Sequence, residues 1–324
     1  MKRIRWGILS TGRIAHQFAQ DLLHVENAEL VCVAARSGDA ANEFAKQYSI
    51  PRAHCGYDAL FADPAVDAVY VATPHTLHLA HSTAALEAGK AVLCEKPLTT
   101  CAADAEALIA VAKRTNGYLM EGMWTYFLPA VQVAQRWVAE GRIGRIRHVK
   151  ADFGYPLLPF DAKRREYDST LAGGCLLEMG IYPIAFAWLF LKQDPASIQV
   201  VARHAPNGVE DDVSMLFDYA DCTATPCTAT LGTSFRAKLR NWAYIIGDEG
   251  YIAIPDFWRA RECMLYRLDE RIDHFDDGRR TLGFEYEARA VGADLMQGKR
   301  ESEIVPWEAS LRFQDHIERI RARF

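Results

Sequence analysis

The strongest constraint on the fold is the alternation of short apolar runs with amphipathic helical patterns along residues 4–122. The runs predict strands at 4–9, 30–35, 68–72, 91–94 and 118–121. The patterns between them predict helices at 14–23, 40–48, 77–88 and 102–115. Almost wholly apolar strands separated by helices indicate a parallel sheet that is covered on both faces. The sequence therefore predicts an α/β Rossmann domain, with a doubly wound parallel sheet, over residues 1-122.

The pattern changes after Gly122. Strand-like segments separated by turn signals, such as Gly-Asp-Glu-Gly at 247–250, dominate the rest of the chain. Helical patterns return at 130–140, 176–191, 284–297 and 308–323. Residues 123-324 are therefore predicted to form an α+β domain with a large, mainly antiparallel open sheet. The length of 324 residues also favours two domains over one.

Composition excludes several classes of protein. The net charge is -5, and no lysine or arginine stripe suggests a nucleic-acid partner. The longest apolar stretch, 181–191, is shorter than the roughly 20 residues that span a bilayer. The eight cysteines form no C-x-x-C pair, so no zinc or redox motif is indicated. Without a signal-peptide pattern, these features favour a cytoplasmic protein that binds no nucleic acid and no membrane.

A tight turn connects the first predicted strand to the first helix. Dinucleotide-binding domains carry G-x-G-x-x-G/A here, but serine replaces the first glycine of this chain. Gly12 still allows close approach of a pyrophosphate, and the helix N-terminus supplies amide donors. The predicted cofactor contacts in this turn are Ser10, Thr11, Gly12, Arg13 and Ile14. An ordinary strand-to-helix turn is the alternative.

The end of the second predicted strand indicates which nicotinamide cofactor is bound. NAD-binding domains usually place a carboxylate there, to bind the ribose hydroxyls. This chain has Arg36 and Ser37 instead. A guanidinium beside a hydroxyl suits a 2′-phosphate through charge-assisted hydrogen bonds. The sequence therefore favours NADP over NAD, with a solvated surface arginine as the alternative.

Three further segments carry a family resemblance. They read TPHTLH at 73–78, EKPLTT at 95–100 and GGCLLEMGIYP at 173–183. With the glycine turn, they make the chain resemble the Gfo/Idh/MocA oxidoreductase family. RWGILSTGRIA and MEGMWTYFLP resemble one branch, the dimeric dihydrodiol dehydrogenases and NADP-dependent xylose or glucose dehydrogenases.

The resemblance implies hydride transfer between a nicotinamide and a carbinol or carbonyl carbon of a sugar or cyclic trans-diol. It also implies a homodimer that pairs the second-domain sheets, and a cis bond between Lys96 and Pro97. Further cofactor contacts are expected from Thr73, Pro74, His78, Glu95, Lys96 and Pro97.

The expected catalytic residues are Lys96, Tyr182 and Glu178. Lys96 ends a predicted strand, where ligands bind in open α/β sheets, and its ammonium can donate a hydrogen bond to the reacting oxygen. The resemblance implies that Tyr182 is the general acid/base. A free tyrosine has a pKa of about 10, and a neighbouring ammonium favours its phenolate form. Glu178 stands where the family has Asp, so it is expected to be either catalytic or a structural ion-pair partner.

The remaining signals are weaker. Trp124, Phe153 and Trp258 are candidate walls of a substrate pocket, although each aromatic ring also suits ordinary core packing. His75 and His78 lack the partners that a metal site needs, so no metal is predicted there. The basic run 163–165 suits either a solvated face or a mobile lid.

Two alternative functions use the same fold. One is a cofactor-binding sensor or regulator without turnover, which has no reason to keep both Lys96 and Tyr182. The other is a hydrolase or lyase with tightly held NAD, which Arg36 argues against. The preferred prediction is an NADP-dependent dehydrogenase acting on CH–OH donors.

Overall fold

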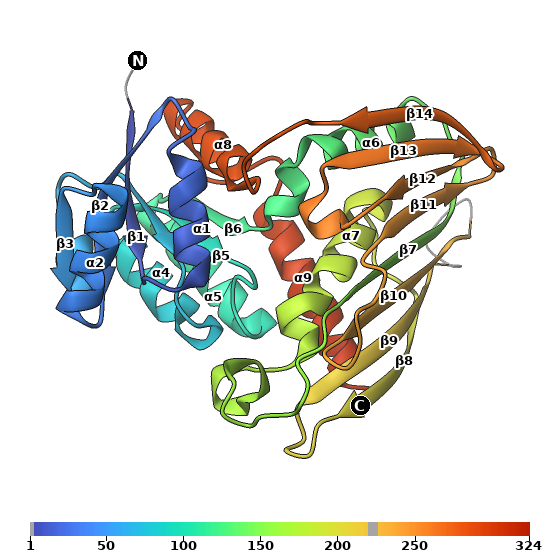
Figure 1. Cartoon of the computed structure of the whole chain (residues 1–324), viewed down its shortest axis with the longest axis horizontal. Coiled ribbons are helices and arrows are strands. Elements are labelled where there is room, and N and C mark those ends of the chain that lie inside the picture. The colour runs from blue at the N-terminus through green and yellow to red at the C-terminus, as the bar shows by residue number, and fades with distance from the viewer. Residues whose placement is uncertain (1–2, 220–225) are drawn as a thin grey trace. The chain divides into compact units, whose positions relative to one another are not determined.

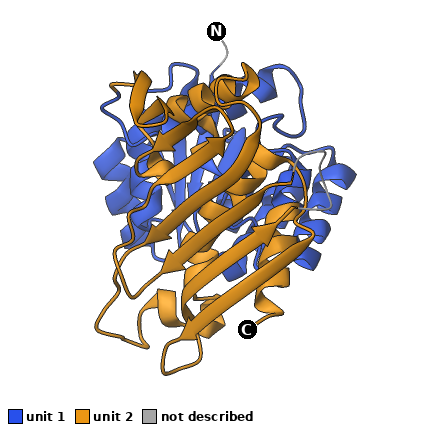
Figure 2. Ribbon diagram, turned by 90° about the vertical axis from the view of Figure 1, so that its right-hand side faces the viewer, with its two compact units in different colours: residues 1–124, 279–311 blue, residues 125–278, 312–324 orange. Residues whose placement is uncertain are grey.

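The computed structural model describes residues 3–219 and 226–324. The chain divides into two compact units, which Figure 2 distinguishes by colour. Unit 1 contains Met1–Trp124 and Arg279–Leu311, and unit 2 contains Thr125–Gly278 and Arg312–Phe324.

Unit 1 is built on a six-stranded parallel sheet with strand order β3-β2-β1-β4-β5-β6 (Figure 1). Its strands are β1 (Ile4–Leu9), β2 (Ala28–Ala35), β3 (Arg52–Cys55), β4 (Ala68–Val71), β5 (Ala91–Glu95) and β6 (Leu119–Gly122). The strand order reverses between β1 and β4, as in a doubly wound domain. Because all strands are parallel, their carboxyl ends lie on one edge of the sheet.

The helices of unit 1 are α1 (Arg13–Leu22), α2 (Gly38–Tyr48), α3 (Asp58–Phe61), α4 (His78–Glu87), α5 (Ala102–Thr115) and α8 (Phe284–Met296). Four of these helices match the prediction, whereas α3 was not predicted and α8 was expected in the second domain. The apolar strands are buried between the layers, and β1, β4 and β5 contain many fully buried residues. The prediction of a Rossmann domain is confirmed.

Residues 279–311 group with unit 1, whereas the sequence placed everything after residue 122 in the second domain. The reason is a set of hydrogen bonds between distant segments. Asp21, near the end of α1, accepts the backbone N–H groups of Leu282, Gly283 and Phe284, at 3.1, 2.7 and 2.9 Å, where α8 begins. Tyr118 also donates to Asp294, at 2.9 Å. The carboxylate of Asp21 therefore caps α8 from a residue far away in sequence.

Unit 2 is an eight-stranded sheet with strand order β14-β13-β12-β11-β7-β10-β9-β8. Its strands are β7 (Ile146–Gly154), β8 (Ser197–His204), β9 (Glu210–Asp218), β10 (Thr228–Ser234), β11 (Ala243–Gly247), β12 (Tyr251–Ile254), β13 (Glu262–Arg267) and β14 (Glu270–Asp276). Among the strand pairs that the described residues form in this sheet, only β7–β10 is parallel, so the prediction of a mainly antiparallel sheet is confirmed. The helices α6 (Pro129–Ala139) and α7 (Ile181–Leu191) belong to this unit, and α9 (Trp307–Arg321) enters it at residue 312.

The helix α7 forms the core of unit 2. It packs against β7 and β10, and nearly all of its residues are buried. Among the described residues, the stretch Ser169–Leu191 is long and apolar enough to cross a membrane, but 83% of its apolar window is buried in the protein. Burial of this kind is expected of the core helix of a globular domain. The seven cysteines that the structure describes are all free thiols, and Cys222 lies outside the described residues.

Candidate active site

The turn after β1 has the backbone geometry of an anion site. Ser10 takes a positive φ of 95°, and its N–H donates to Ala34 O, at 2.8 Å. Gly12 is the N-cap of α1, no side chain caps this helix, and its first turn contains no acidic residue. Thr11 and Ile14 are half-buried, and Arg13 is exposed. The free amides and the helix dipole therefore favour a negatively charged ligand here.

The space around Gly12 provides a test of whether a dinucleotide fits. A Cβ added at Gly12 would meet only the Ser10 hydroxyl, at 3.8 Å, so the fold itself does not require glycine there. The backbone of this turn is open to close approach from outside. An uncapped helix start beside an exposed glycine fits the pyrophosphate of a nicotinamide dinucleotide.

Arg36 and Ser37 follow directly after β2, on the same sheet edge. Both are exposed. The Ser37 hydroxyl caps α2 by accepting from Ala40 N, at 3.5 Å. The last residues of β2 are alanines, so no carboxylate occupies the usual position of the ribose ligand.

Lys96 lies immediately beyond β5, and the Lys96–Pro97 bond is cis. The fully buried His78 ring lies between two carbonyl oxygens: Nδ1 is 2.8 Å from Pro97 O, and Nε2 is 2.8 Å from Thr73 O. Burial lowers the pKa of His78 to about 4, so the ring is neutral at physiological pH and donates a hydrogen bond through only one of these nitrogens. Pro74 precedes the short 3-10 turn His75–Leu77. The His78 ring therefore packs between the turn that carries Lys96 and the loop after β4, and bonds to one of them.

Two further carboxyl groups were not predicted to be part of the site. Glu121, on β6, accepts Leu98 N at 2.8 Å, directly after the Lys96–Pro97 bond. Burial raises the pKa of Glu121 to about 7. Glu287, on α8, is fully buried, and neither of its oxygens has a hydrogen-bond partner among the described residues. Burial, and to a lesser degree the charge of Glu95, raise the pKa of Glu287 well above its usual value.

Glu95 is itself buried and accepts a hydrogen bond from the Tyr70 hydroxyl. Glu95 ends β5, Glu121 lies in β6, and Gly122 brings the β6 backbone close to Glu287. The Lys96 turn therefore rests on a buried layer that is rich in carboxyl groups. Sequence patterns treat isolated glutamates as solvent-exposed, so they gave no signal for this layer.

In unit 2, Tyr182 belongs to an aromatic cluster that includes two predicted pocket residues. Its ring meets Phe153 edge to face, with centroids 5.4 Å apart, and lies 6.1 Å from the Trp258 ring. Phe153 and Trp258 stack at 4.7 Å. Tyr182 and Phe153 are buried, whereas Trp258 is half-buried. The third pocket candidate, Trp124, belongs to unit 1, where its ring stacks on Phe284 at 4.3 Å.

Glu178 lies one turn before Tyr182, in a wide π-helical turn, Leu176–Gly180, that precedes α7. Pro183 has no N–H to offer to the preceding turn, and a widened turn of this kind is common at functional sites. The Glu178 carboxylate pairs with Arg165 at 2.8 Å. Of the basic run 163–165, Lys163 and Arg164 are exposed, whereas Arg165 turns inward. This pairing supports a structural role for Glu178, which the sequence left open.

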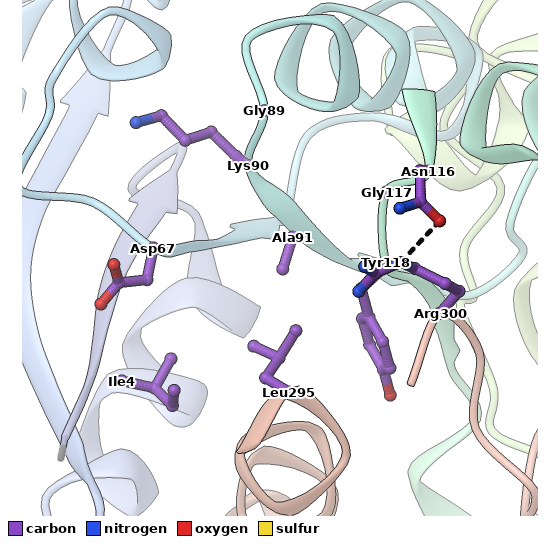
Figure 3. Close-up of a pocket in the computed structure, with 10 residues that line it drawn as sticks. All are labelled: Ile4, Asp67, Gly89, Lys90, Ala91, Asn116, Gly117, Tyr118, Leu295 and Arg300. Carbon is purple, nitrogen blue, oxygen red and sulfur yellow. Dashed lines mark hydrogen bonds between the residues drawn. The ribbon is translucent and has the colours of Figure 1, made fainter. Parts of the chain in front are cut away.

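A separate cavity of about 220 Å³ lies at the opposite edge of the unit 1 sheet (Figure 3). Its walls include Ile4 and Ala91, which begin β1 and β5, and Tyr118, which precedes β6. None of the predicted site residues lines this cavity. The Lys90 ammonium is directed elsewhere, to the carbonyls of Asp63 and Val66, at 2.6 and 3.0 Å. Ligands of open α/β sheets bind at the carboxyl edge, so this cavity is not the candidate site.

Known proteins are similar to this chain in both sequence and fold. Residues 4–123 match the GFO_IDH_MocA model, described as an oxidoreductase family with an NAD-binding Rossmann fold, and residues 131–253 match the GFO/IDH/MocA C-terminal domain. The trans-1,2-dihydrobenzene-1,2-diol dehydrogenases of Mus musculus and Homo sapiens are each 34% identical to this chain. Both alignments cover 98% of this chain and 96% of the relative.

Among solved structures, an aldose-aldose oxidoreductase from Caulobacter crescentus, complexed with glycerol, has a TM-score of 0.89. At 24% identity, it covers 99% of this chain and 97% of its own, and it supports the fold alone. A 3-ketoreductase from Actinomadura kijaniata, in complex with NADP and TDP-benzene, has a TM-score of 0.85 and 29% identity. It covers 99% of this chain and 98% of its own. The chain therefore belongs to the Gfo/Idh/MocA family of oxidoreductases, whose Rossmann domain binds a nicotinamide cofactor.

Proposed function

We propose that the protein is an NADP(H)-dependent dehydrogenase that acts on the carbinol or carbonyl carbon of a sugar or cyclic trans-diol. One observation carries the proposal: Lys96 directly follows β5 at the carboxyl edge of the unit 1 sheet, and unit 2 holds Tyr182 in an aromatic cluster. The dihydrodiol dehydrogenases and the sugar-type oxidoreductases to which the chain is similar support these two substrate classes.

The cofactor is assigned to the carboxyl edge of unit 1. The exposed turn at Gly12 and the amides of α1 would hold the pyrophosphate, and Arg36 with Ser37 would hold the 2′-phosphate. NADP in the similar 3-ketoreductase supports this assignment. The bound nicotinamide supplies or accepts the hydride.

The chain's own residues control the proton. In the oxidation direction, the Tyr182 oxygen takes the proton of the substrate hydroxyl while the carbinol hydrogen leaves as hydride, and in reduction it returns that proton. In this proposal, the Lys96 ammonium donates a hydrogen bond to the reacting oxygen of the substrate, and its positive charge favours the phenolate form of Tyr182. Phe153 and Trp258 form an apolar wall that suits the face of a sugar or diol ring.

Single and double variants test these roles. Tyr182→Phe should lower turnover by about 10²- to 10⁴-fold while leaving NADPH binding intact. Lys96→Met should also lower turnover. The fold-loss of turnover in the double variant should be smaller than the product of the two single fold-losses, because both groups are proposed to act on the same reacting oxygen. Tyr126→Phe is the matched control, since it removes a buried hydroxyl that donates to Ala185 O in α7, at 2.6 Å.

Near-normal turnover in Tyr182→Phe would end the acid/base assignment. A wild-type protein that binds NADPH but turns over no sugar or diol would favour the sensor alternative.

We further propose a homodimer formed through the outer face of the unit 2 sheet, a cytoplasmic location, and no nucleic-acid or membrane partner. Figure 2 looks onto the broad sheet of unit 2. Val201 and Leu216 on this sheet are 60% and 38% exposed, and Tyr251 stacks on Tyr266 at 4.8 Å. Sedimentation of the purified protein should give the mass of two chains. Val201→Glu should shift it toward one chain.

A further inference from the structure

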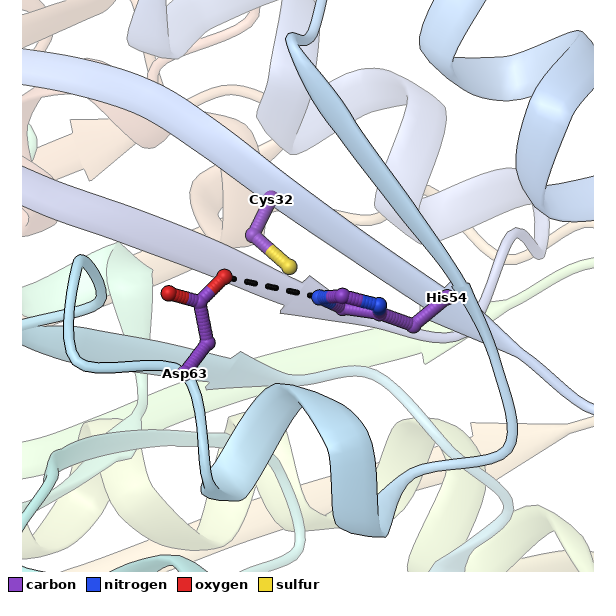
Figure 4. A group of neighbouring side chains, drawn as sticks. All are labelled: Cys32, His54 and Asp63. Carbon is purple, nitrogen blue, oxygen red and sulfur yellow. Dashed lines mark hydrogen bonds and ion pairs between the residues drawn. The ribbon is translucent and has the colours of Figure 1, made fainter.

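A group of three potential metal ligands lies in unit 1 (Figure 4). Cys32 is on β2 and His54 is on the neighbouring parallel strand β3. In the parallel register of β2 and β3, His54 lies beside Ala34, which is two residues after Cys32. Side chains two residues apart on a strand point to the same face, so Cys32 and His54 project from the same face of the sheet. Asp63, just after α3, reaches the same place.

The three side chains are already close to a coordinating arrangement. The Cys32 sulfur, a ring nitrogen of His54 and a carboxylate oxygen of Asp63 all lie within 4.8 Å of one another. His54 Nε2 is 3.4 Å from Asp63 Oδ2. Bond lengths of about 2.0 to 2.3 Å to a tetrahedral zinc ion place neighbouring ligand atoms about 3.3 to 3.6 Å apart. The cluster therefore needs only a small contraction to surround an ion.

Hydrogen bonds hold the carboxylate of Asp63 in position. Oδ1 accepts from Ala65 N at 2.8 Å, and Oδ2 accepts from Arg52 Nε at 2.7 Å. A carboxylate offers about four lone-pair sites, so these bonds leave room for a metal bond. Lys90 donates to the backbone carbonyls of Asp63 and Val66 and so fixes the loop. Partners of this kind orient metal ligands in known sites.

The charges around the cluster restrict which kinds of cation can bind there. Arg52 and Lys90 oppose any cation, whereas Asp63 and a deprotonated Cys32 attract one. A hard ion such as Mg²⁺ or Ca²⁺ prefers oxygen ligands and would gain little from the sulfur or the imidazole. An ion that bonds strongly to thiolate and imidazole can overcome the repulsion. The Arg52 side chain is 37% exposed, so it can also move toward solvent.

We propose that Cys32, His54 and Asp63 form a binding site for Zn²⁺ or a similar borderline-soft divalent cation. Cys32 loses its thiol proton to solvent when the metal–sulfur bond forms. Cys32 is fully buried, whereas the His54 side chain is 27% exposed, so the ion enters from the His54 side. With three protein ligands, the fourth position is filled by water. Cys32 lies on β2 four residues before Arg36, about 13 Å along an extended chain, whereas His54 pairs with Ala34 and lies nearer the carboxyl edge of the sheet.

Cobalt(II) is the probe, because its bond to a thiolate gives a charge-transfer band that other ligands do not produce. The full-length protein, stripped with a chelator, is titrated with Co²⁺ and then with Zn²⁺. We expect one equivalent of Co²⁺ to give the band and Zn²⁺ to displace it. His54→Gln should weaken Co²⁺ binding by at least about tenfold. Because this side chain is partly exposed, the variant should fold.

Cys32→Ser should abolish the charge-transfer band, and a circular dichroism spectrum checks that this variant is folded. Cys55→Ser is the matched control, since Cys55 is an exposed thiol one residue from His54. The band should persist in Cys55→Ser. The proposal is overturned if Co²⁺ gives no thiolate band, if His54→Gln binds as tightly as the wild type, or if the band is lost with Cys55 rather than Cys32. None of these outcomes depends on dehydrogenase activity.

Discussion

Replacing Glu121 by glutamine should change how the stability of the protein depends on pH. Glu121 is fully buried, and burial raises its pKa from 4.5 to about 7. Between these values, the folded state holds a proton that the unfolded state has lost, so stability falls as pH rises from 4.5 and levels off above 7. A shift of about 2.5 units corresponds to about 3 kcal/mol of lost stability. Glutamine cannot ionise, and its carbonyl can still accept Leu98 N.

Equilibrium unfolding in urea, at a series of pH values from about 5 to 8.5, measures this effect if the m-values of the two proteins agree. As the pH rises across that range, the free energy of unfolding of Glu121→Gln should increase by about 2 to 3 kcal/mol relative to that of the wild type. Glu106→Gln on α5 is the matched control, because Glu106 is exposed in the same unit and should leave the pH profile unchanged. Parallel pH profiles for Glu121→Gln and the wild type would refute the buried, protonated carboxyl.

Three further variants test other parts of the site. Arg36→Ala should weaken NADPH binding by about 10- to 100-fold and leave NADH binding unchanged, as measured by fluorescence titration; equal losses would contradict the 2′-phosphate role. Gly12→Ala should leave the melting temperature unchanged but weaken NADPH by about tenfold or more, because its Cβ fits the fold. Arg165→Met should lower the melting temperature, and adding Glu178→Gln should restore part of it, because the single variant leaves an unpaired carboxylate. A double variant less stable than Arg165→Met would contradict this pairing.

The first domain was predictable because its signals are local. Every strand of unit 1 except β3 contains an apolar run. The sequence of β3, Arg-Ala-His-Cys, has no such run and none of its residues is fully buried, so the sequence analysis missed this strand. The glycine turn, the Arg36 tip and the Lys96–Pro97 turn follow strand ends, so their common position at the sheet edge follows from parallel topology. The helix α8 was also predicted, but its membership of unit 1 was not. That membership depends on Asp21 and Tyr118, which reach it from distant parts of the chain.

Buried ionisable side chains were the main feature that the sequence did not predict. A pattern of residues assigns glutamates to the surface, whereas Glu121 and Glu287 are enclosed beneath the Lys96 turn. The basic run 163–165 did not indicate that Arg165 alone turns inward to Glu178. The group of Cys32, His54 and Asp63 draws on three separate segments, so no spacing motif announces it. Such contacts depend on how elements pack, which local periodicity does not encode.

The most direct test of the proposed function is the reduction of NADP by the purified protein, followed by absorbance. Aldoses and trans-dihydrodiols are offered side by side, with NAD as the control cofactor. The account predicts turnover with one of these substrate classes, with NADP strongly preferred over NAD, and loss of that turnover in Tyr182→Phe. Tight binding of NADPH without turnover of any substrate in the panel would contradict it, as would equal rates with NAD and NADP.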